Sequence, residues 1–362
     1  MDQLTLKSLA KSTDLVEALN FAATLGNLDA VNHLVDLSEK SFLSVMLHDN
    51  ADEAFHNALR NGHTQVVHRL IELTPNEILL SHMLRSRDYE ALVETAESGK
   101  VELLKLLMKS LDEVQKSDEP NNKDEMFFAK GRLAFESAAK NGHLNFLKEF
   151  VALAHNSTTL EAKIPAAKLA VDSKHLKVFK YLLTELNHFS EQRERMLADT
   201  RNKAFLHACG MGDTELMQLL LDSTLSLETK NKMIHGNLDM PFLVAAASDQ
   251  TDAVKLLITA TPDHDLKRAM LARNNHRAAY YAAENGNPLM LSVLLGVAKD
   301  FGIDMGSVVS DINRHYDERL SDYRTGAEQY PSAIDYRESS KGRLINSFEP
   351  LTNPASPLLV TR

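Results

Sequence analysis

A short motif recurs along the chain at nearly constant spacing, and this repetition constrains the fold more than any other sequence feature. Ala58–His63 (Ala-Leu-Arg-Asn-Gly-His) returns as Ala138–His143 and, more loosely, as Ala282–Asn287. One frame fits all three copies and places turn residues 36, 37, 43, 32, 38, 37 and 37 residues apart: Gly26, Gly62, Gly99, Gly142, Lys174, Gly212, Asp249 and Gly286. A fixed period of this length is typical of repeat proteins, so the 362 residues predict about eight stacked units rather than two or three globular domains.

Each unit has the pattern of a helix, a turn and a second helix. Small residues such as Ala245 and Ala246 stand four and three positions before the turn residue, where they let two helices approach closely. Apolar residues follow the turn residue at the fourth, fifth, eighth and ninth positions, which in the second unit are Val66, Val67, Leu70 and Ile71. That spacing is the stripe of a helix packed on one face. Glycine ends a helix with a positive φ at no steric cost, so Lys174 and Asp249 predict either strain or a different turn.

Six of the thirteen methionines share a second phase, sixteen residues before the next turn residue, and an apolar residue follows each of them. They are Met46, Met83, Met126, Met196, Met233 and Met270. Helix-start signals precede several of them, most clearly in Thr74–Glu77, where threonine can cap, proline suits the first turn and glutamate completes a capping box. Ser190, Ser226 and Thr261 are expected to open equivalent segments. The sequence therefore predicts a third, connecting helix in most units, with the methionines in a buried seam rather than on a metal- or ligand-binding surface.

The helix pairs, with Ala-Ala-x-x-Gly-His turns followed by Val-Val-x-x-Leu-Ile, resemble ankyrin repeats over about Asp14 to Gly296. The chain departs from that family at its Thr-Pro-Leu-His opening, which is replaced by Glu-Ala-Phe-His at residues 53–56. Its period also exceeds the usual repeat of about 33 residues. The resemblance implies an all-α, ankyrin-like helical solenoid of about eight repeats, in which short helices largely replace the hairpin fingers. The units also look similar to divergent ankyrin proteins that intracellular bacteria deliver into host cells.

The repeat array is expected to span residues 14–296, with a capping helix on each side, because a terminal repeat would otherwise expose its stacking face. The N-terminal cap is predicted at residues 1–13 and the C-terminal cap within residues 297–323, where Ser307–Tyr323 has an amphipathic pattern. Residues 324–362 are rich in Ser, Pro and Gly without a sustained period, and are predicted to be irregular or disordered.

Two spacings between turns are irregular. The longest contains Leu111–Glu125, whose charges and Pro-Asn-Asn sequence predict a mobile surface loop. In the shortest, Thr158 replaces the methionine and Ile164–Pro165 follows. The array is expected to bend or to change its surface there.

Composition excludes several classes of function. The net charge of −10, the absence of tryptophan and an aromatic content of 6% leave neither a basic stripe nor stacking platforms for nucleic acid. No apolar run approaches the ~18 residues of a membrane span, so membrane insertion is not expected. A single cysteine and an N-terminus without a secretory pattern favour a reducing, cytoplasmic location.

The sequence shows no known catalytic or metal-binding pattern. A zinc helix, a phosphate-binding glycine loop and a Gly-x-Ser-x-Gly nucleophile turn are all missing. His207 and Cys209 lie two residues apart on a predicted helix and therefore point to nearly opposite faces, so Cys209 is expected to be a buried structural residue. His63, His143 and His175 directly follow turn residues, and the family resemblance implies that they tie adjacent turns by hydrogen bonds. We expect no enzyme activity, no cofactor and no metal site.

The expected function is a non-enzymatic scaffold that binds a protein partner on the concave face of the array. The resemblance places the two residues before each turn glycine on that face: Arg60, Asn61, Glu97, Ser98, Lys140, Asn141, Glu284 and Asn285. Their mixed charge and size suit a recognition surface, although simple solvation explains any one of them equally well.

Two alternatives stay open. One is a secreted bacterial effector that recruits a host protein in the host cytosol, with a translocation signal in the C-terminal segment that ends in the apolar Pro357–Val360. The other is an enzyme with an unrecognised site. Neither the identity of the partner nor the oligomeric state is predicted.

Overall fold

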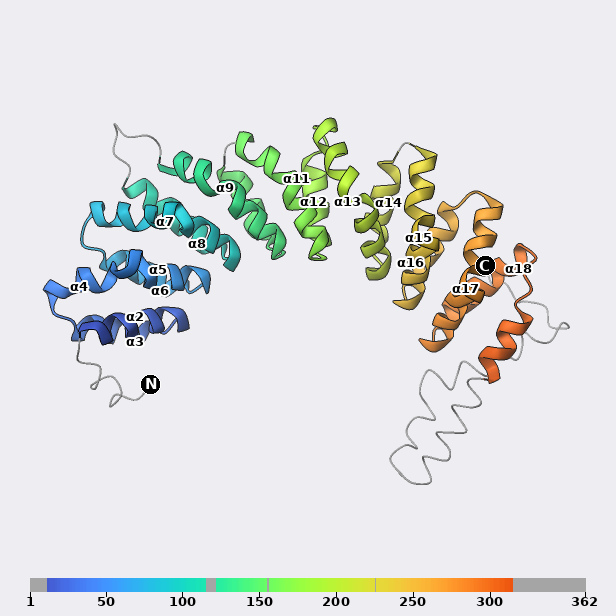
Figure 1. Ribbon diagram of the computed structural model, residues 1–362, viewed down its shortest axis with the longest axis horizontal. Coiled ribbons are helices and arrows are strands. Elements are labelled where there is room, and N and C mark those ends of the chain that lie inside the picture. The colour runs from blue at the N-terminus through green and yellow to red at the C-terminus, as the bar shows by residue number, and fades with distance from the viewer. Residues whose placement is uncertain (1–11, 115–121, 155, 225, 315–362) are drawn as a thin grey trace, which may run out of the picture. The chain divides into compact units, whose positions relative to one another are not determined.

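The computed structural model describes residues 12–114, 122–154, 156–224 and 226–314 (Figure 1). All regular secondary structure in these ranges is helical, which confirms the predicted all-α class. The chain divides into two compact units, residues 1–200 and residues 201–362. None of the described helices combines the length and the apolar character that a membrane span requires.

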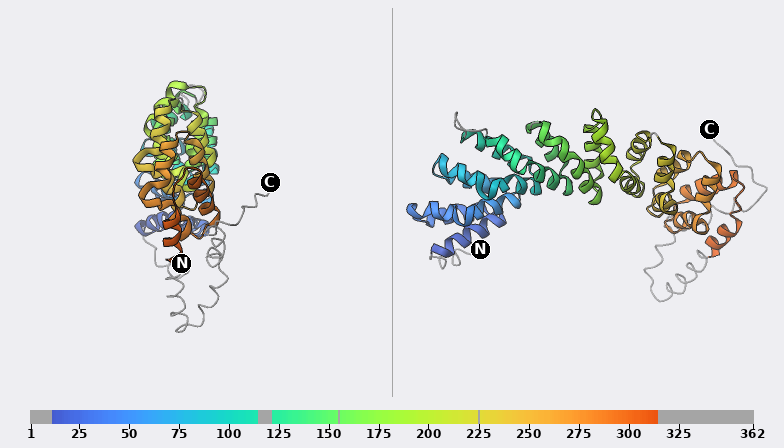
Figure 2. Two further views of the ribbon diagram at one scale, coloured as in Figure 1. Left: turned by 90° about the vertical axis from the view of Figure 1, so that its right-hand side faces the viewer. Right: turned by 45° about the horizontal axis from the view of Figure 1, so that its top comes forward.

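The first unit consists of two layers of helices that lie alongside their neighbours in both figures (Figure 1, Figure 2). First-layer helices pack against one another in chain order: α2 (Ser12–Leu25), α5 (Asp49–Arg60), α7 (Glu77–Ser98), α9 (Asn122–Lys140) and α11 (Asn156–Asp172). Second-layer helices follow the same order: α3 (Leu28–Leu37), α6 (Thr64–Leu73), α8 (Val101–Glu113), α10 (Leu144–Leu153) and α12 (Leu176–Glu185). α4 (Lys40–Leu47) connects α3 to α5. The predicted helix pairs are therefore present.

The second unit has the same kind of pairing. α13 (Ser190–Met211) begins in the first unit and ends in the second. The helices that follow it are α14 (Thr214–Asp222), α15 (Leu227–Ala247), α16 (Thr251–Ala260), α17 (His264–Glu284) and α18 (Pro288–Asp300). α15 and α17 pack together as first-layer helices, while α16 contacts both α14 and α18.

Only part of each predicted end segment lies within the described residues. Residues 306–314 form a helix in which Val308 and Ile312 are buried, as expected for the start of the closing helix. The N-terminal cap up to residue 11 and the segment from residue 315 onward, including the predicted tail, lie outside the described residues. The predicted loop at Leu111–Glu125 is wrong at both ends, because α8 continues to Glu113 and α9 begins at Asn122.

Every predicted turn residue has a positive φ. Six are glycines, and Lys174 and Asp249 adopt the same left-handed conformation with φ of 64° and 62°. Strain rather than a different turn is therefore the outcome at these two positions, since a left-handed residue with a side chain costs roughly 1–2 kcal/mol.

Four first-layer helices contain a break that the sequence did not predict. In α7, Ser86 is extended and the next three residues are left-handed before the helix resumes. The same sequence of conformations recurs at 236–239 in α15 and 273–276 in α17, and α5 has three left-handed residues at 50–52. Asn or Asp occupies seven of the twelve left-handed positions, and these residue types tolerate that conformation best. Each break separates the predicted connecting helix from the helix that precedes the turn.

The described residues of α9, α11 and α13 contain no such left-handed break. All six methionines of the predicted seam are buried, at 0–2% exposure. Two predicted helix starts are wrong. Asn76 rather than Thr74 caps α7, and Asp263 rather than Thr261 caps α17, because both threonines instead donate their hydroxyls to the end of the preceding helix. Ser226 caps α15 as predicted.

Candidate functional site

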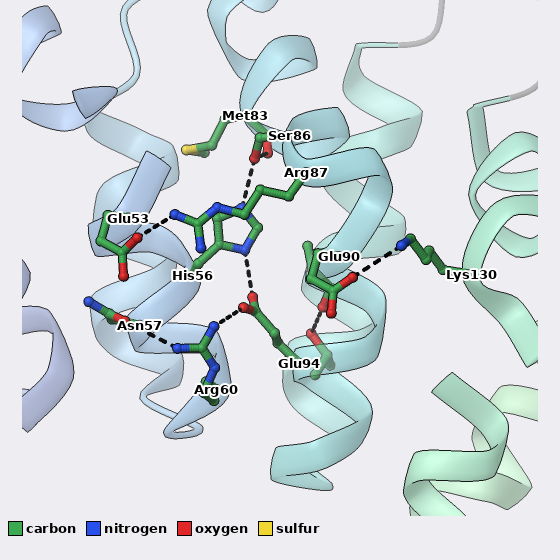
Figure 3. Close-up of polar contacts among 12 residues, drawn as sticks. Glu53, His56, Asn57, Arg60, Met83, Ser86, Arg87, Glu90, Glu94 and Lys130 are labelled. Atoms are coloured by element: carbon green, nitrogen blue, oxygen red, sulfur yellow. Dashed lines mark hydrogen bonds and ion pairs between the residues drawn. The ribbon is translucent and has the colours of Figure 1, made fainter. Parts of the chain in front are cut away.

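The first-layer helices of the first unit contain a buried polar network that joins α5 to α7 (Figure 3). His56 on α5 donates from Nδ1 to Oε2 of Glu94 on α7, at 2.6 Å, and the side chains of both residues are at most 2% exposed. Arg60, one turn further along α5, donates to the other carboxylate oxygen of Glu94 at 2.7 Å. Both carboxylate oxygens are therefore occupied by donors from the preceding helix.

Ser86 completes this network at the break in α7. Its Oγ lies 2.8 Å from Nε2 of His56 and donates to the carbonyl of Met83 at 2.6 Å. The hydroxyl of Ser86 therefore bridges His56 on α5 and the carbonyl of Met83 in its own helix. A buried carboxylate held by a histidine and a guanidinium is a stable arrangement only while every partner is present.

The contacts Ser86–His56–Glu94 have the order of a hydrolase triad, in which a carboxylate orients a histidine that takes a proton from serine. Two features differ from that chemistry. The Ser86 hydroxyl proton is bound by a backbone carbonyl, and the imidazole of His56 has no exposed surface. These contacts instead hold the break of α7 against α5.

Ion pairs at the surface join the same helices. Arg87 pairs with Glu53 and donates to the carbonyl of Asn50 at 2.9 Å, so it links the break of α7 to that of α5. The hydrogen bond from Arg87 holds the pKa of Glu53 below its usual value. Lys130 on α9 reaches Glu90 on α7 at 3.2 Å. Each first-layer helix from α5 to α9 is thus tied to the next by a charged contact.

Two of the three turn histidines make the hydrogen bonds that the resemblance implied; the side chain of His175 makes none among the described residues, although its ring lies against Gly142. His63 and His143 use Nε2 to donate to carbonyls of the preceding turn, to Thr24 at 3.0 Å and to Glu97 at 2.9 Å. The ring of His63 also covers Gly26, where any Cβ would overlap it. In the second unit Asn285 has an equivalent role, since its amide donates to the carbonyls of Ala246 and Ala247.

The eight residues predicted to bind a partner fall into two groups. Four have side chains that make structural contacts: Arg60 with Glu94, Asn61 with the carbonyl of Asn57, Ser98 with the carbonyl of Thr95, and Asn285 with the preceding turn. Ser98 is also half-buried. The side chains of Glu97, Lys140 and Asn141 are exposed and have no hydrogen bond or ion pair among the described residues, and Glu284 reaches only Arg277, at 3.7 Å. Sequence reasoning placed Arg60 on the surface but missed its buried partner.

Glu94 itself left a weak sequence signal, because it interrupts the apolar run Leu92–Ala96. It lies 38 residues after His56, about one repeat, so successive helices bring the two together. A comparison of polar residues at buried positions in successive repeats could have identified this pair.

The unbroken helices α9, α11 and α13 form a cleft of about 350 Å³ within the first unit. Its charged lining residues are Arg132, Lys168, Arg195 and Asp199. Its remaining lining residues are Ile164, Pro165, Met196 and Thr200. It lies in the part of the chain where the repeat spacing is shortest.

The structure buries the Cys209 thiol and gathers no metal-binding cluster among the described residues. Burial raises the pKa of the Cys209 thiol to about 12, which confirms the expectation of a buried, unreactive cysteine. Among the described residues, His, Cys, Asp and Glu form no group of three that could hold a metal ion.

No protein-family model matches the chain, and a search of curated proteins finds no match.

Proposed function

We propose that this chain is a non-enzymatic helical-repeat protein, of the ankyrin-like type, that binds a protein partner through the exposed ends of its first-layer helices. One observation supports the proposal most directly. The polar groups that join the repeats, such as His63, His143 and Glu94, are used up by contacts between neighbouring helices. The exposed positions beside the turns, such as Glu97 and Lys140, make no such contacts and differ in charge from unit to unit. A repeat protein is suited to recognition when internal contacts hold its helices together and its exposed positions differ from unit to unit.

A paired set of variants tests this surface. Glu97→Arg with Lys140→Glu reverses two charges on the proposed surface. Glu102→Arg with Lys177→Glu makes the same changes on the exposed sides of the second-layer helices α8 and α12. Arg60 is left unchanged because it holds Glu94.

In affinity capture with the full chain, followed by mass spectrometry, the first variant is expected to lose a partner that the wild type and the second variant retain. Both variants are expected to unfold at the wild-type temperature. Equal capture by all three proteins would contradict the proposed surface.

The triad-like contacts of Ser86 allow a direct test of the non-enzymatic assignment. A fluorophosphonate probe reacts with serine hydroxyls that a histidine activates. We expect no labelling of Ser86 in the folded protein, because its proton is bound by Met83 and its histidine is buried. Labelling that disappears in His56→Gln would instead establish a hydrolase site.

A further inference from the structure

The cleft between α9, α11 and α13 differs from the rest of the first-layer surface in its backbone. Helices α5 and α7 break into left-handed residues at 50–52 and 87–89, and their side chains there join neighbouring helices. In α9, α11 and α13 the described helix continues through the corresponding region. The cleft between these three helices has a volume of about 350 Å³.

The charge of the cleft is opposite to that of the chain. Three cationic side chains, one from each of the three helices, face a single carboxylate, whereas the whole chain has a net charge of −10. Within the described ranges, Arg132 pairs only inside its own helix, with Glu136 at 2.7 Å. Lys168 is exposed and has no ion pair or hydrogen bond among the described residues. Arg60, Arg87 and Lys130, by contrast, are bound to carboxylates of neighbouring first-layer helices.

The floor of the cleft is apolar. Met196 is fully buried, and Ile164 and Pro165 are half-buried beside it. The volume is at the low end of the roughly 300–1,000 Å³ of small-molecule pockets, which suits a short segment with one apolar side chain. An apolar floor inside a cationic rim is complementary to an apolar residue flanked by carboxylates.

We propose that this cleft holds an acidic peptide segment of the protein partner, an inference that rests on the proposed protein-binding function and specifies the partner's chemistry. The apolar side chain of the segment lies on Ile164 and Pro165. Its carboxylates pair with Arg132 and Lys168 at the rim. Asp199 excludes a carboxylate from its own side of the cleft and so helps to set the position of the segment.

Fluorescence anisotropy with the full chain and a labelled Glu-Glu-Leu-Glu-Glu peptide tests the proposal. The double variant Arg132→Gln/Lys168→Gln is expected to bind the peptide about tenfold more weakly than the wild type. The control Lys148→Gln/Lys177→Gln removes the same charge from α10 and α12 and is expected to bind as the wild type does. Binding is also expected to weaken with added salt and when leucine is replaced by glycine in the peptide.

Three results would overturn the proposal: no binding at about 1 mM peptide, equal weakening in both double variants, or equally tight binding of an oligothymidylate at the same residues. Affinity capture of the partner shows whether only the cleft assignment fails or the proposed binding function fails as well. If Arg132→Gln/Lys168→Gln retains the partner while Glu97→Arg/Lys140→Glu loses it, the cleft assignment is wrong and the binding function stands. If both variants retain the partner, the binding surface itself is wrong.

Discussion

Glu94 in the first unit and Asp239 in the second are both buried carboxylates that lie near a break in a first-layer helix, but different neighbours hold them. Glu94 lies beyond the break of α7, and its donors, His56 and Arg60, come from the preceding helix. Asp239 is the last left-handed residue of the break in α15. Its donors are His235 of the same helix, at 2.7 Å, and Arg273 of the following helix, at 2.6 Å.

The difference shows that the two units share the break in the backbone of a first-layer helix, but that the residues around the buried carboxylate occupy different positions. In each case one anion between a histidine and an arginine closes the contact between successive first-layer helices. The anion stands at different positions relative to the break. Both partners of Glu94 come from the preceding helix, whereas Asp239 is held by one residue of its own helix and one of the following helix. Substitutions of the two carboxylates can test whether each network of charged hydrogen bonds stabilises its unit.

The largest effect is expected for Glu94→Ala. Removing this carboxylate leaves His56 buried without its anion, and the loss of one partner from a buried ion pair costs about 3–5 kcal/mol. Urea denaturation of the full chain measures the change in the free energy of unfolding. The control Glu97→Ala removes an exposed carboxylate three residues away and is expected to change stability by less than about 0.5 kcal/mol. Equal effects would mean that the network does not hold α5 to α7.

A smaller effect, about 2 kcal/mol, is expected for Asp239→Asn, which keeps the shape of the side chain but loses charge-assisted hydrogen bonds. Burial alone would raise the pKa of Asp239, but hydrogen bonds from His235 and Arg273 hold it below the usual value near 3.8. A carboxyl whose pKa is lowered in the folded state stabilises the protein above its unfolded pKa and stops doing so as pH falls through its folded pKa.

The stability difference between wild type and Asp239→Asn is therefore expected to be constant from about pH 6 to about pH 5 and to shrink below about pH 4. Urea denaturation across this range measures it. Asp252→Asn, an exposed change in α16, serves as the control for general effects of acid. A difference that persists unchanged at low pH would show that the ionised form of Asp239 is not what the network binds.

The turns allow a comparison in which the backbone is the same and only the neighbour differs. Gly62 and Gly99 have φ of 73° and 68°. A Cβ on Gly62 would meet the flexible side chain of Lys100 and, at 3.4 Å, the Cβ of Ser98, whereas one on Gly99 would overlap the ring of His143. Gly62→Ala is expected to cost about 1 kcal/mol from backbone strain alone. Gly99→Ala is expected to cost more, because the histidine must leave its carbonyl partner.

Thermal unfolding of the two single variants and of Gly99→Ala in a His143→Ala background measures this difference. Without the ring of His143, the cost of Gly99→Ala is expected to fall to that of Gly62→Ala. If the cost is the same in both backgrounds, the histidine does not constrain the preceding turn.

Local features of the fold could be predicted from the sequence because they depend on periodicity. The turn frame, the helix pairs and the buried methionines all follow from residues that recur at fixed spacing. The left-handed breaks could not be predicted, because the residues that favour them are not constant. Asn274 and Asn275 suit this conformation, but Arg87 and Tyr89 adopt it as well. Tertiary contacts such as that of Arg87 with Glu53 decide the conformation there.

The candidate site was less predictable because its contacts cross from one unit to the next. Arg60 has an exposed position in the repeat, yet Glu94, its partner, lies 34 residues away on the next first-layer helix. The cleft depends on three helices together. Its sequence signal, the short spacing around Thr158 and Pro165, indicated an irregularity without showing that it would be a cavity.

The smallest effect, and the only gain in stability, is expected for Lys174→Gly. Lys174 adopts the left-handed conformation that glycine has at six other turns, with φ of 64°. Relief of roughly 1–2 kcal/mol of strain is partly offset by the 0.5–1 kcal/mol that glycine loses through its greater freedom in the unfolded chain, so a net gain between zero and about 1.5 kcal/mol is expected. Lys177→Gly, an exposed change inside α12, is the matched control and is expected to cost about 1 kcal/mol. Thermal unfolding distinguishes the two, and a loss of stability in Lys174→Gly would mean that the lysine side chain stabilises this turn by more than its backbone strain.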